Sequence, residues 1–372
     1  MKEHPTSERK LSHIKIVSEE AVEARETLTG LEDITLIHCA LPDIDLTEVN
    51  LETKFLKHAF KAPIYVTGMT GGHEVAAKIN GQIAEAVEEL GLGMGVGSQR
   101  AAIENPQLAS TFGIVRENAP TAFIVANIGI PQLKSDPVGM CQKAIEMIEA
   151  DALAIHLNPI QEIVQPGGEP QFKKGIERIE RITKEISLPV IVKETGGGIS
   201  RSVATRLQDA GVAAIDVSGV GGTSWAGVEY YRAKDASNPL KERLGELLWD
   251  WGLPTAVSIA EVRSVVKLPI ISSGGIRNGV EIVKSIALGA QLGGMASPVL
   301  KRAISGGVPA VKEFLQQTIE EIRAATYLSG SKNMESLGGA DFVVKGETRE
   351  WLEQRGLSPG SHTKKHRKQP PR

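Results

Sequence analysis

The sequence predicts an α/β protein that folds as one (β/α)8 TIM barrel with an N-terminal extension and an insertion between the sixth and seventh strands. Short apolar runs that end in glycine or small polar residues alternate with segments of helical periodicity along most of the chain. Eight such runs are present, and the ends of successive runs are about 20 to 35 residues apart, as β/α units require. One gap of about 55 residues, between Ser218 and Gly274, is too long for a single unit and indicates the insertion.

The eight predicted strands are short and rich in β-branched residues, as is typical of strands buried on both faces. They cover residues 63–67 (PIYVT), 91–96 (GLGMGV), 122–127 (AFIVAN), 152–157 (ALAIHL), 189–193 (PVIVK), 213–217 (AAIDV), 269–272 (PIIS) and 290–295 (AQLGGM). An open doubly wound sheet is the alternative fold. Its dinucleotide-binding fingerprint is matched only weakly, by GMGVGS at residues 93–98, because no acidic residue follows a second strand about 20 positions later.

Helices are predicted between the strands because apolar residues recur there at intervals of three and four. Asp136, which precedes a proline, and Asn278 favour helix starts, whereas Gly91 and Gly289 are typical of helix ends. The expected helical stripes lie at residues 79–90, 138–148, 172–186, 203–207 and 283–286. A last helix over residues 309–327 is expected to close the barrel.

Three parts of the chain are expected: an extension packed on the barrel (1–60), the FMN-binding barrel discussed below (61–330) and a C-terminal segment (331–372). The long gap would hold an active-site lid or an oligomer contact. Residues 362–372 (HTKKHRKQPPR) carry five basic side chains and no acid. Two interpretations of this basic stretch stay open, a disordered, solvated tail and a weak contact with an acidic partner.

Composition excludes several classes of protein. The 372 residues include 42 basic and 45 acidic side chains, and this net charge of −3 argues against a nucleic-acid partner. Hydrophobic residues make up 41% and charged residues 23%, as in globular proteins. Cys39 and Cys141 are too few for a disulfide framework or a multi-cysteine metal site. No signal-peptide pattern or run of about 18 apolar residues occurs, so we expect a cytoplasmic protein without a membrane partner.

In a TIM barrel, function resides where the strands end, so the residues that follow the predicted strands are the candidates for a site. They form a polar, glycine-rich set. Its members include Thr67, Gly68, Met69, Thr70, Ser98, Arg100, Asn127, His156, Asn158, Gln161, Glu162, Lys193, Ser218, Thr223, Gly275, Ile276, Arg277, Ala296 and Ser297.

The residues after the seventh and eighth strands are where barrels commonly bind phosphate through backbone N–H groups and a helix N-terminus. Gly274 and Gly275 lack a Cβ and allow an anion to approach the backbone, and Arg277 can add a charged donor. The alternative is that these glycines only make a tight turn.

Three other strand-end residues can each be interpreted in two ways. Lys193 either extends to solvent or faces a ligand in a poorly hydrated pocket. Asn127 is either a satisfied core amide or a hydrogen-bonding partner of a planar heterocycle. Glu162 can hold Mg²⁺ only if substrate phosphates and waters complete the coordination shell, and otherwise it is an ordinary carboxylate. The metal interpretation therefore implies a phosphorylated substrate.

The absence of certain residue types from the second half of the chain limits the classes of reaction that are possible. No histidine occurs between His156 and His362, and neither cysteine lies at a late strand end. This excludes a histidine base or cysteine nucleophile from the second half of the barrel. A G-x-S-x-G nucleophile elbow is also absent. A bound cofactor is therefore expected to carry the chemistry.

Seven motifs together resemble type 2 isopentenyl diphosphate isomerase, the flavin-dependent enzyme that interconverts isopentenyl and dimethylallyl diphosphates. They are RKLSH (9–13), TGMTGG (67–72), GSQR (97–100), HLNPIQE (156–162), KETGGGIS (193–200), GGTSW (221–225) and SGGIR (273–277). The glycine motifs are shared with other FMN barrels, whereas HLNPIQE combined with the basic N-terminal pair is specific. The resemblance extends from residue 9 to residue 345.

The resemblance implies FMN and Mg²⁺ as cofactors and NADPH as the reductant. FMN would contact Thr67, Gly68, Met69, Thr70, Ser98, Asn127, Lys193, Ser218, Thr223, Gly275, Ile276, Arg277, Ala296 and Ser297. The substrate would contact Arg9, Lys10, Ser98, Arg100, His156, Asn158 and Gln161. Glu162 would bind Mg²⁺.

The resemblance also implies catalytic roles. Reduced FMN would supply, from N5, the proton that an unactivated alkene needs, Gln161 would lie near the isoprenoid carbons, and Lys193 would favour the anionic flavin. Self-association, as a tetramer or octamer, is expected of an acidic barrel with a long insertion. Two alternatives stay open. Another FMN-dependent barrel oxidoreductase would use a late histidine, cysteine or serine as base, and this chain lacks the histidine and the cysteine. A non-catalytic phosphometabolite-binding barrel would bind no FMN.

Overall fold

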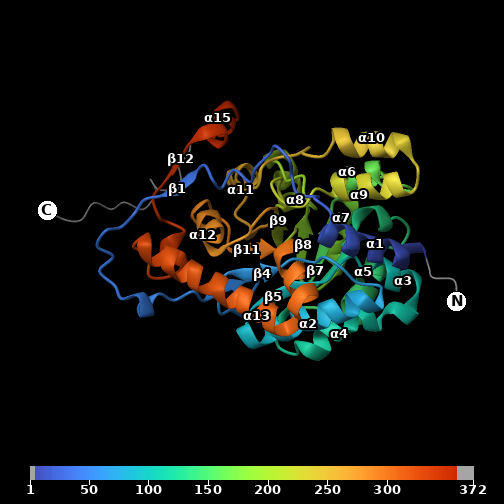
Figure 1. Ribbon diagram of the computed structural model, residues 1–372, viewed down its shortest axis with the longest axis horizontal. Helices are drawn as coiled ribbons and strands as arrows, with labels where there is room; N and C mark the ends of the chain where they lie inside the picture. The colour runs from blue at the N-terminus through green and yellow to red at the C-terminus, as the bar shows by residue number, and fades with distance from the viewer. Residues whose placement is uncertain (1–4, 358–372) are drawn as a thin grey trace.

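The computed structural model describes residues 5–357, and its centre is a closed barrel of eight parallel strands (Figure 1). The strands are β4 (Ile64–Val66), β5 (Gly93–Gly95), β6 (Phe123–Gly129), β7 (Ala152–His156), β8 (Val190–Lys193), β9 (Ala214–Asp216), β10 (Ile270–Ser272) and β11 (Leu292–Met295). Each of the eight predicted runs supplies one strand. The barrel closes where β11 pairs in parallel with β4, with Met295 opposite Val66, which excludes the open sheet. The (β/α)8 prediction is confirmed.

Helices cover the outside of the barrel, and several have the expected ends. Gly91 ends the first of them with a φ of 62°, a left-handed conformation that glycine adopts without strain. Asp136 and Asn278 each cap a helix N-terminus by accepting a backbone N–H with the side chain. These connecting helices are α2 (Glu74–Leu90), α3 (Arg100–Glu104), α4 (Ser110–Asn118), α5 (Pro137–Met147), α6 (Pro159–Val164), α7 (Gly175–Glu185), α8 (Arg201–Asp209) and α12 (Gly279–Ala287).

The closing helix is longer than predicted. It was expected over residues 309–327, but α13 (Ser297–Leu328) begins directly after the last strand. The helix is kinked at Gly307, whose φ of 62° and ψ of −152° are not helical, and Pro309 follows. The predicted segment is therefore the second half of a broken helix, and the first half places its N-terminus at the end of β11.

The barrel interior is apolar near the starts of the strands and polar near their ends. Near the strand starts, inward side chains pack on Phe55 and Phe60, which come from the hairpin of β2 (Thr53–Phe55) and β3 (His58–Phe60). These inward residues are Tyr65, Val125, Ala154, Ile191, Ala214, Ile271 and Leu292. Because strand side chains alternate between faces, the next inward residue on each strand lies two positions later, toward the strand end. On these seven strands, β5 being the exception, the next residues are Thr67, Asn127, His156, Lys193, Asp216, Ser273 and Gly294.

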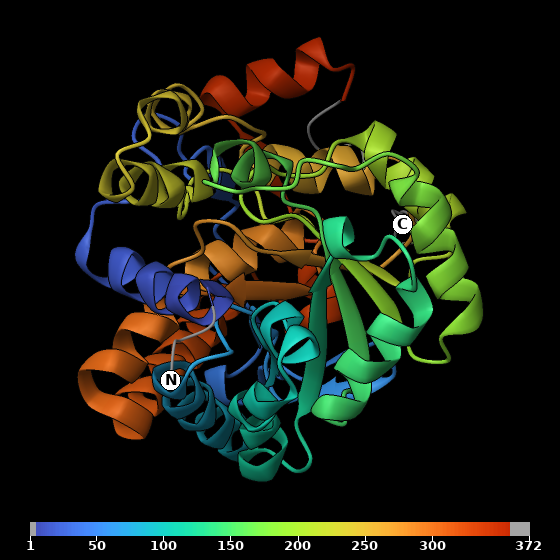
Figure 2. The same ribbon diagram turned by 90° about the vertical axis from the view of Figure 1, so that its right-hand side faces the viewer.

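The insertion and the first helix lie at this polar end. The insertion contains α9 (Trp225–Asp235), α10 (Pro239–Leu247) and α11 (Thr255–Arg263) and separates β9 from β10, as expected. In Figure 1, α9 and α10 lie at the upper right, where both contact α6. The first helix, α1 (Pro5–Glu19), contacts α2, α9 and α13 and lies beside the barrel end, at the left of Figure 2.

A small second sheet joins the two ends of the described chain. β1 (Ile34–Leu36) pairs antiparallel with β12 (Phe342–Val344) at the left of Figure 1. α14 (Met334–Leu337) precedes β12, and α15 (Gly346–Gln354) follows it. Within residues 5–357, no helix combines the length and apolarity needed to cross a bilayer. The basic stretch at 362–372 lies outside the described residues.

Candidate active site

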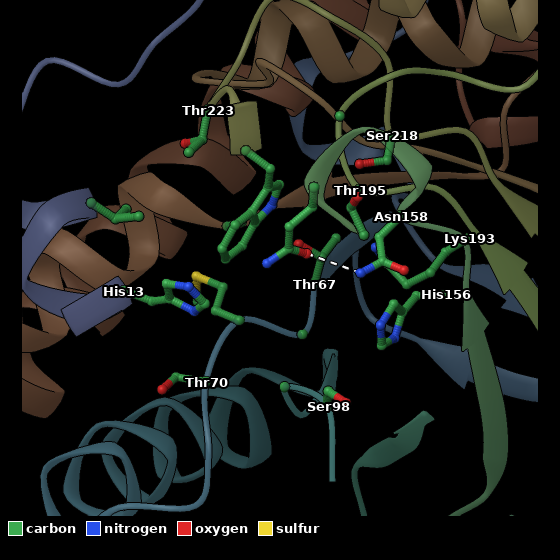
Figure 3. A pocket seen from close by; sticks show the side chains of 18 of the residues that line it. His13, Thr67, Thr70, Ser98, His156, Asn158, Lys193, Thr195, Ser218 and Thr223 are labelled. Carbon is green, nitrogen blue, oxygen red and sulfur yellow. Dashed lines mark hydrogen bonds between the residues drawn. The ribbon is translucent and has the colours of Figure 1, made fainter. Parts of the chain in front are cut away.

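Every residue to which the sequence assigned a ligand lines one cavity at the strand ends (Figure 3). The lining includes Arg9, Lys10, Thr67, Gly68, Met69, Thr70, Ser98, Arg100, Asn127, His156, Asn158, Gln161, Glu162, Lys193, Ser218, Thr223, Gly275, Ile276, Arg277, Ala296 and Ser297. These residues come from α1, from the ends of the barrel strands and from the loops and helices that follow those ends. Side chains separated by almost 300 positions in the chain thus share one site because the barrel gathers its strand ends there.

Asn127 and His156 form a hydrogen-bonded pair on neighbouring strands. Asn127 donates from Nδ2 to the carbonyl of Val96 at 3.0 Å, so its Oδ1 is the acceptor that faces His156 Nδ1 at 2.9 Å. His156 must therefore carry its proton on Nδ1. Burial, with the charges of Lys193 and Lys10, lowers the pKa of His156 to about 3, and the ring is neutral at pH 7.

Lys193 ends β8 and faces the cavity, so the solvent-facing interpretation is wrong. Its side chain is buried, and Nζ donates to the carbonyl of Glu194 at 2.5 Å. The Glu194 carboxylate accepts N–H groups of Thr195 and Gly196, both at 2.6 Å, which holds the loop that follows β8. The ammonium is thus fixed at the cavity wall by the backbone.

A backbone cradle lies where the sequence predicted a phosphate site. Gly275 has a φ of 77°, and a Cβ there would lie 2.6 Å from the carbonyl oxygen of Gly221. Ala296 and Ser297 place the N-terminus of α13 at the same wall. Arg277 also lines the cavity, but its guanidinium is paired with Glu23. The close approach and the helix N-terminus both suit an anion.

The opposite wall carries concentrated positive charge. Arg9 and Lys10 project from α1, and Arg100 begins α3. Burial and the charges of Arg9 and Arg100 lower the pKa of Lys10 to about 7. Burial also lowers the pKa of Arg9, whose Nε is buried without a hydrogen-bond partner in the described chain. Cations held this close repel one another, so the wall favours a polyvalent anion.

Polar side chains of the HLNPIQE motif form hydrogen bonds with one another and with Glu229 of the insertion. Asn158 Nδ2 donates to Gln161 Oε1 at 3.1 Å, and Gln161 Nε2 donates to Glu229 Oε1 at 3.1 Å (Figure 3 labels Asn158). Glu229 is fully buried on α9 and also contacts His13 Nε2 at 2.9 Å and Arg232 at 2.6 Å. The amide of Gln161 is thus held in one orientation.

Glu229 and His13 are held in defined protonation states. Burial raises the pKa of Glu229, but the charge and hydrogen bond of His13, the charge of Arg232 and the Gln161 amide together lower it to about 2. Burial lowers the pKa of His13 to about 4 despite the nearby carboxylate. At pH 7, Glu229 is therefore ionised and His13 is a neutral donor.

Glu162 is the carboxylate predicted to bind a metal. It is buried, with Oε1 accepting from Asn158 at 3.1 Å and Oε2 from the N–H of Glu169 at 2.7 Å. Within residues 5–357, no group of three or more His, Cys, Asp or Glu residues could hold a metal ion by itself. A metal at Glu162 would need ligands from a substrate, as the sequence predicted.

The similarity of the chain to known proteins identifies its family. A profile of the FMN-dependent dehydrogenase family matches residues 133–344. An isopentenyl-diphosphate delta-isomerase of Methanosarcina mazei is 50% identical over 353 residues, which cover 95% of this chain and 96% of that protein. The chain belongs to the isopentenyl-diphosphate delta-isomerase family. Another family member, from Archaeoglobus fulgidus, is 48% identical over 94% of this chain and 99% of its own length.

A solved structure of mandelate oxidase with (S)-2-phenylpropionate has the same fold as this isomerase-family chain. The TM-score is 0.62 at 16% sequence identity, over 90% of this chain and 94% of that chain. At this identity the similarity supports the barrel alone.

Sequence reasoning missed some residues in the site of this isomerase-family chain. Glu229 was not singled out, and neither Trp225, whose ring lies 5.1 Å from that of His13, nor His13 had a role. Glu229 lies in a helix of the insertion, and nothing in the local sequence indicates that it faces Gln161. Asp216, the register partner of the cavity-lining Lys193, was counted only as part of a strand. A signal was present there, because an acidic residue inside a buried strand needs a partner.

Proposed function

We propose that this protein interconverts isopentenyl diphosphate and dimethylallyl diphosphate by protonation and deprotonation, with FMN as cofactor. One observation carries the proposal: the basic pair Arg9 and Lys10 and the strand-end residues Asn127 and Lys193 line the same cavity. One wall suits a diphosphate and the other a flavin. Relatives about half identical over nearly the whole chain are named for this activity.

The described residues suit FMN. Gly275 and the N-terminus of α13 would hold its phosphate, and Asn127 and Lys193 would face its ring system. Thr70 Oγ1 is buried without a hydrogen-bond partner in the described chain, as expected of a group whose partner is a ligand. The other proposed contacts are Thr67, Gly68, Met69, Ser98, Ser218, Thr223, Ile276, Arg277, Ala296 and Ser297. When bound and reduced, FMN supplies an acid strong enough to protonate an alkene.

The substrate diphosphate would lie on the opposite wall. Arg9, Lys10 and Arg100 would neutralise it, and its negative charge would relieve their mutual repulsion. The other proposed contacts are Ser98, His156, Asn158 and Gln161. Mg²⁺ would be held by Glu162, the diphosphate oxygens and water.

Several side chains would orient the hydrocarbon part of the substrate without exchanging protons. Gln161 is fixed between Asn158 and Glu229, so its side chain can position the isoprenoid carbons. Trp225 faces the cavity beside His13 and offers an apolar surface that suits developing positive charge. α1 lies at the barrel end and would exclude water. Lys193 would favour negative charge on the cofactor.

The proposal extends to the reductant, the cellular location, the oligomeric state and the roles of the three parts of the chain. NADPH would reduce FMN once, without net consumption of electrons in the isomerisation. The protein would act in the cytoplasm as a homo-oligomer, a tetramer or octamer. Residues 1–60 would act as an extension that completes the substrate wall, residues 61–330 as the FMN-binding barrel, and residues 331–372 as a separate C-terminal segment.

The proposal is tested on protein reconstituted with FMN, reduced with NADPH without oxygen and supplied with Mg²⁺ and isopentenyl diphosphate. We expect dimethylallyl diphosphate as the product. Enzyme left oxidised should be inactive, and a 2-hydroxy acid should not bleach the flavin. Colourless protein that binds no FMN, or full isomerisation with oxidised FMN, would contradict the proposal.

A further inference from the structure

Asp216 lies beside Lys193 inside the barrel. It is the last residue of β9, and its Cα is the register partner of Lys193 on β8. The N–H of Glu194 donates to the Asp216 carbonyl at 3.2 Å, which holds the two strand ends level. Partners on adjacent parallel strands present their side chains on the same face. Both side chains belong to the inward set described above.

The Asp216 carboxylate is buried and only partly satisfied. The side chain is 1% exposed, and Oδ1 accepts the Ser273 hydroxyl at 2.5 Å. Oδ2 is buried without a hydrogen-bond partner of normal geometry in the described chain. To stay ionised, a carboxyl in this position needs a counter-ion, because an uncompensated buried charge is strongly unfavourable and the group is otherwise protonated.

Lys193 is the cation that interacts with this carboxylate. Burial raises the pKa of Asp216 and outweighs the charge of Lys193, the Ser273 hydroxyl and the Ser218 backbone, so the ionised form depends on Lys193 and these two donors. Tyr65 is a neutral phenol, because burial and the charge of Asp216 raise its pKa. Lys193 uses one N–H on the Glu194 carbonyl and has two more donors.

We propose that Asp216 is a positioning residue that acts as the counter-ion of Lys193 and sets how much of the positive charge of the ammonium reaches a bound flavin. This inference rests on the proposed FMN-dependent function. With Asp216 ionised, the pair is neutral overall and presents a dipole. Without it, Lys193 presents a full charge, which favours electrons on the flavin.

The test measures the two-electron midpoint potential of bound FMN in the intact holoenzyme. Asp216→Asn keeps the size of the side chain and removes its charge, so the equilibrium should shift toward reduced FMN by at least tenfold, which is about 30 mV for two electrons. Ser273→Ala removes the donor to Oδ1 and should shift it in the same direction by less. The control is Asp209→Asn, the same charge change at an exposed residue, and it should leave the potential unchanged.

A double-mutant cycle separates this role from a structural one. In a Lys193→Met background, Asp216→Asn should no longer shift the potential, because the buried carboxyl is already protonated when its counter-ion is absent. An unchanged potential in D216N, or an equal shift in both backgrounds, overturns the role of Asp216. If D216N is insoluble, the Ser273→Ala variant is the test, and an unchanged midpoint potential in that variant overturns the proposal. Wild-type protein that binds no FMN overturns the proposed function first.

Discussion

Asn158 Nδ2 donates to Glu162 Oε1 at 3.1 Å, and this hydrogen bond orients the single carboxylate available to a metal in the HLNPIQE motif. The backbone N–H of Glu169 donates to the second oxygen at 2.7 Å. Both donors would compete with a cation for the carboxylate lone pairs. Metal binding at Glu162 is therefore expected to need the substrate phosphates as additional ligands.

Replacing Glu162 with Gln should raise the Mg²⁺ concentration needed for half-maximal activity by at least tenfold and leave FMN bound. The amide keeps the shape of the side chain and loses the negative charge that attracts Mg²⁺. Activity is titrated with Mg²⁺, and FMN retention is followed by absorbance. Glu185→Gln, at the exposed end of α7, is the control. An unchanged Mg²⁺ requirement would remove Glu162 from the metal site.

Affinity for a diphosphate should fall as pH rises above about 7, by at most tenfold per pH unit. Burial, Arg9 and Arg100 lower the pKa of Lys10 from 10.5 to about 7, so the unliganded side chain loses its charge there, while a bound anion favours the charged form. Calorimetry with inorganic pyrophosphate in two buffers of different ionisation heat measures the expected proton uptake.

Lys10→Arg is the matched variant for this pH dependence, because guanidinium keeps its charge. It should bind pyrophosphate with a flatter pH profile, whereas Lys10→Met should lose about 1.5 to 3 kcal/mol of binding free energy at pH 6. The lowered pKa also means that unfolded chains bind more protons between pH 7 and 10.5, so Lys10 makes the unliganded protein more stable as pH rises. A pH-independent affinity in the wild type would show that Lys10 does not face the diphosphate.

Replacing Gly275 with Ala should cost about 1 to 3 kcal/mol of folding free energy and weaken FMN binding at least tenfold. The φ of 77° is strained for alanine, and the new Cβ would lie 2.4 Å from Thr29 Cγ2. Gly175→Ala is the control, because its Cβ would lie 3.7 Å from the nearest atom. Chemical denaturation and FMN titration give the two quantities, and a stable variant with normal FMN affinity would rule out the cradle.

Replacing Glu229 with Gln should lower the free energy of unfolding at pH 7 by about 3 kcal/mol, because Arg232 and His13 lose a buried partner. The pKa of this carboxyl falls from 4.5 to about 2 on folding, so its stabilisation is complete above about pH 4.5 and is lost as pH falls toward 2. The difference between wild type and variant should shrink over that range. Exposed Glu353→Gln should change stability by less than about 1 kcal/mol.

The barrel and most of its rim could be predicted from local patterns. Residues 189–193 illustrate why, since a short apolar run that ends in a charged residue is typical of a buried strand with a functional tip. Helix ends such as Gly91 were predictable because backbone conformation and capping depend on neighbouring residues. The kink at Gly307 was missed because the expected helix began only at Pro309, and the helical residues before it were assigned to no element.

The sequence alone determined the strand order, the residues at each strand tip and the basic pair near the N-terminus. Only the tertiary structure decided that Arg9 faces the strand tips, that Glu229 from the insertion holds Gln161, and that Asp216 lies level with Lys193. The physical reason is that local patterns report the periodicity of one segment. Which distant charges are buried together depends on how the segments pack, and that packing sets their pKa values and their partners.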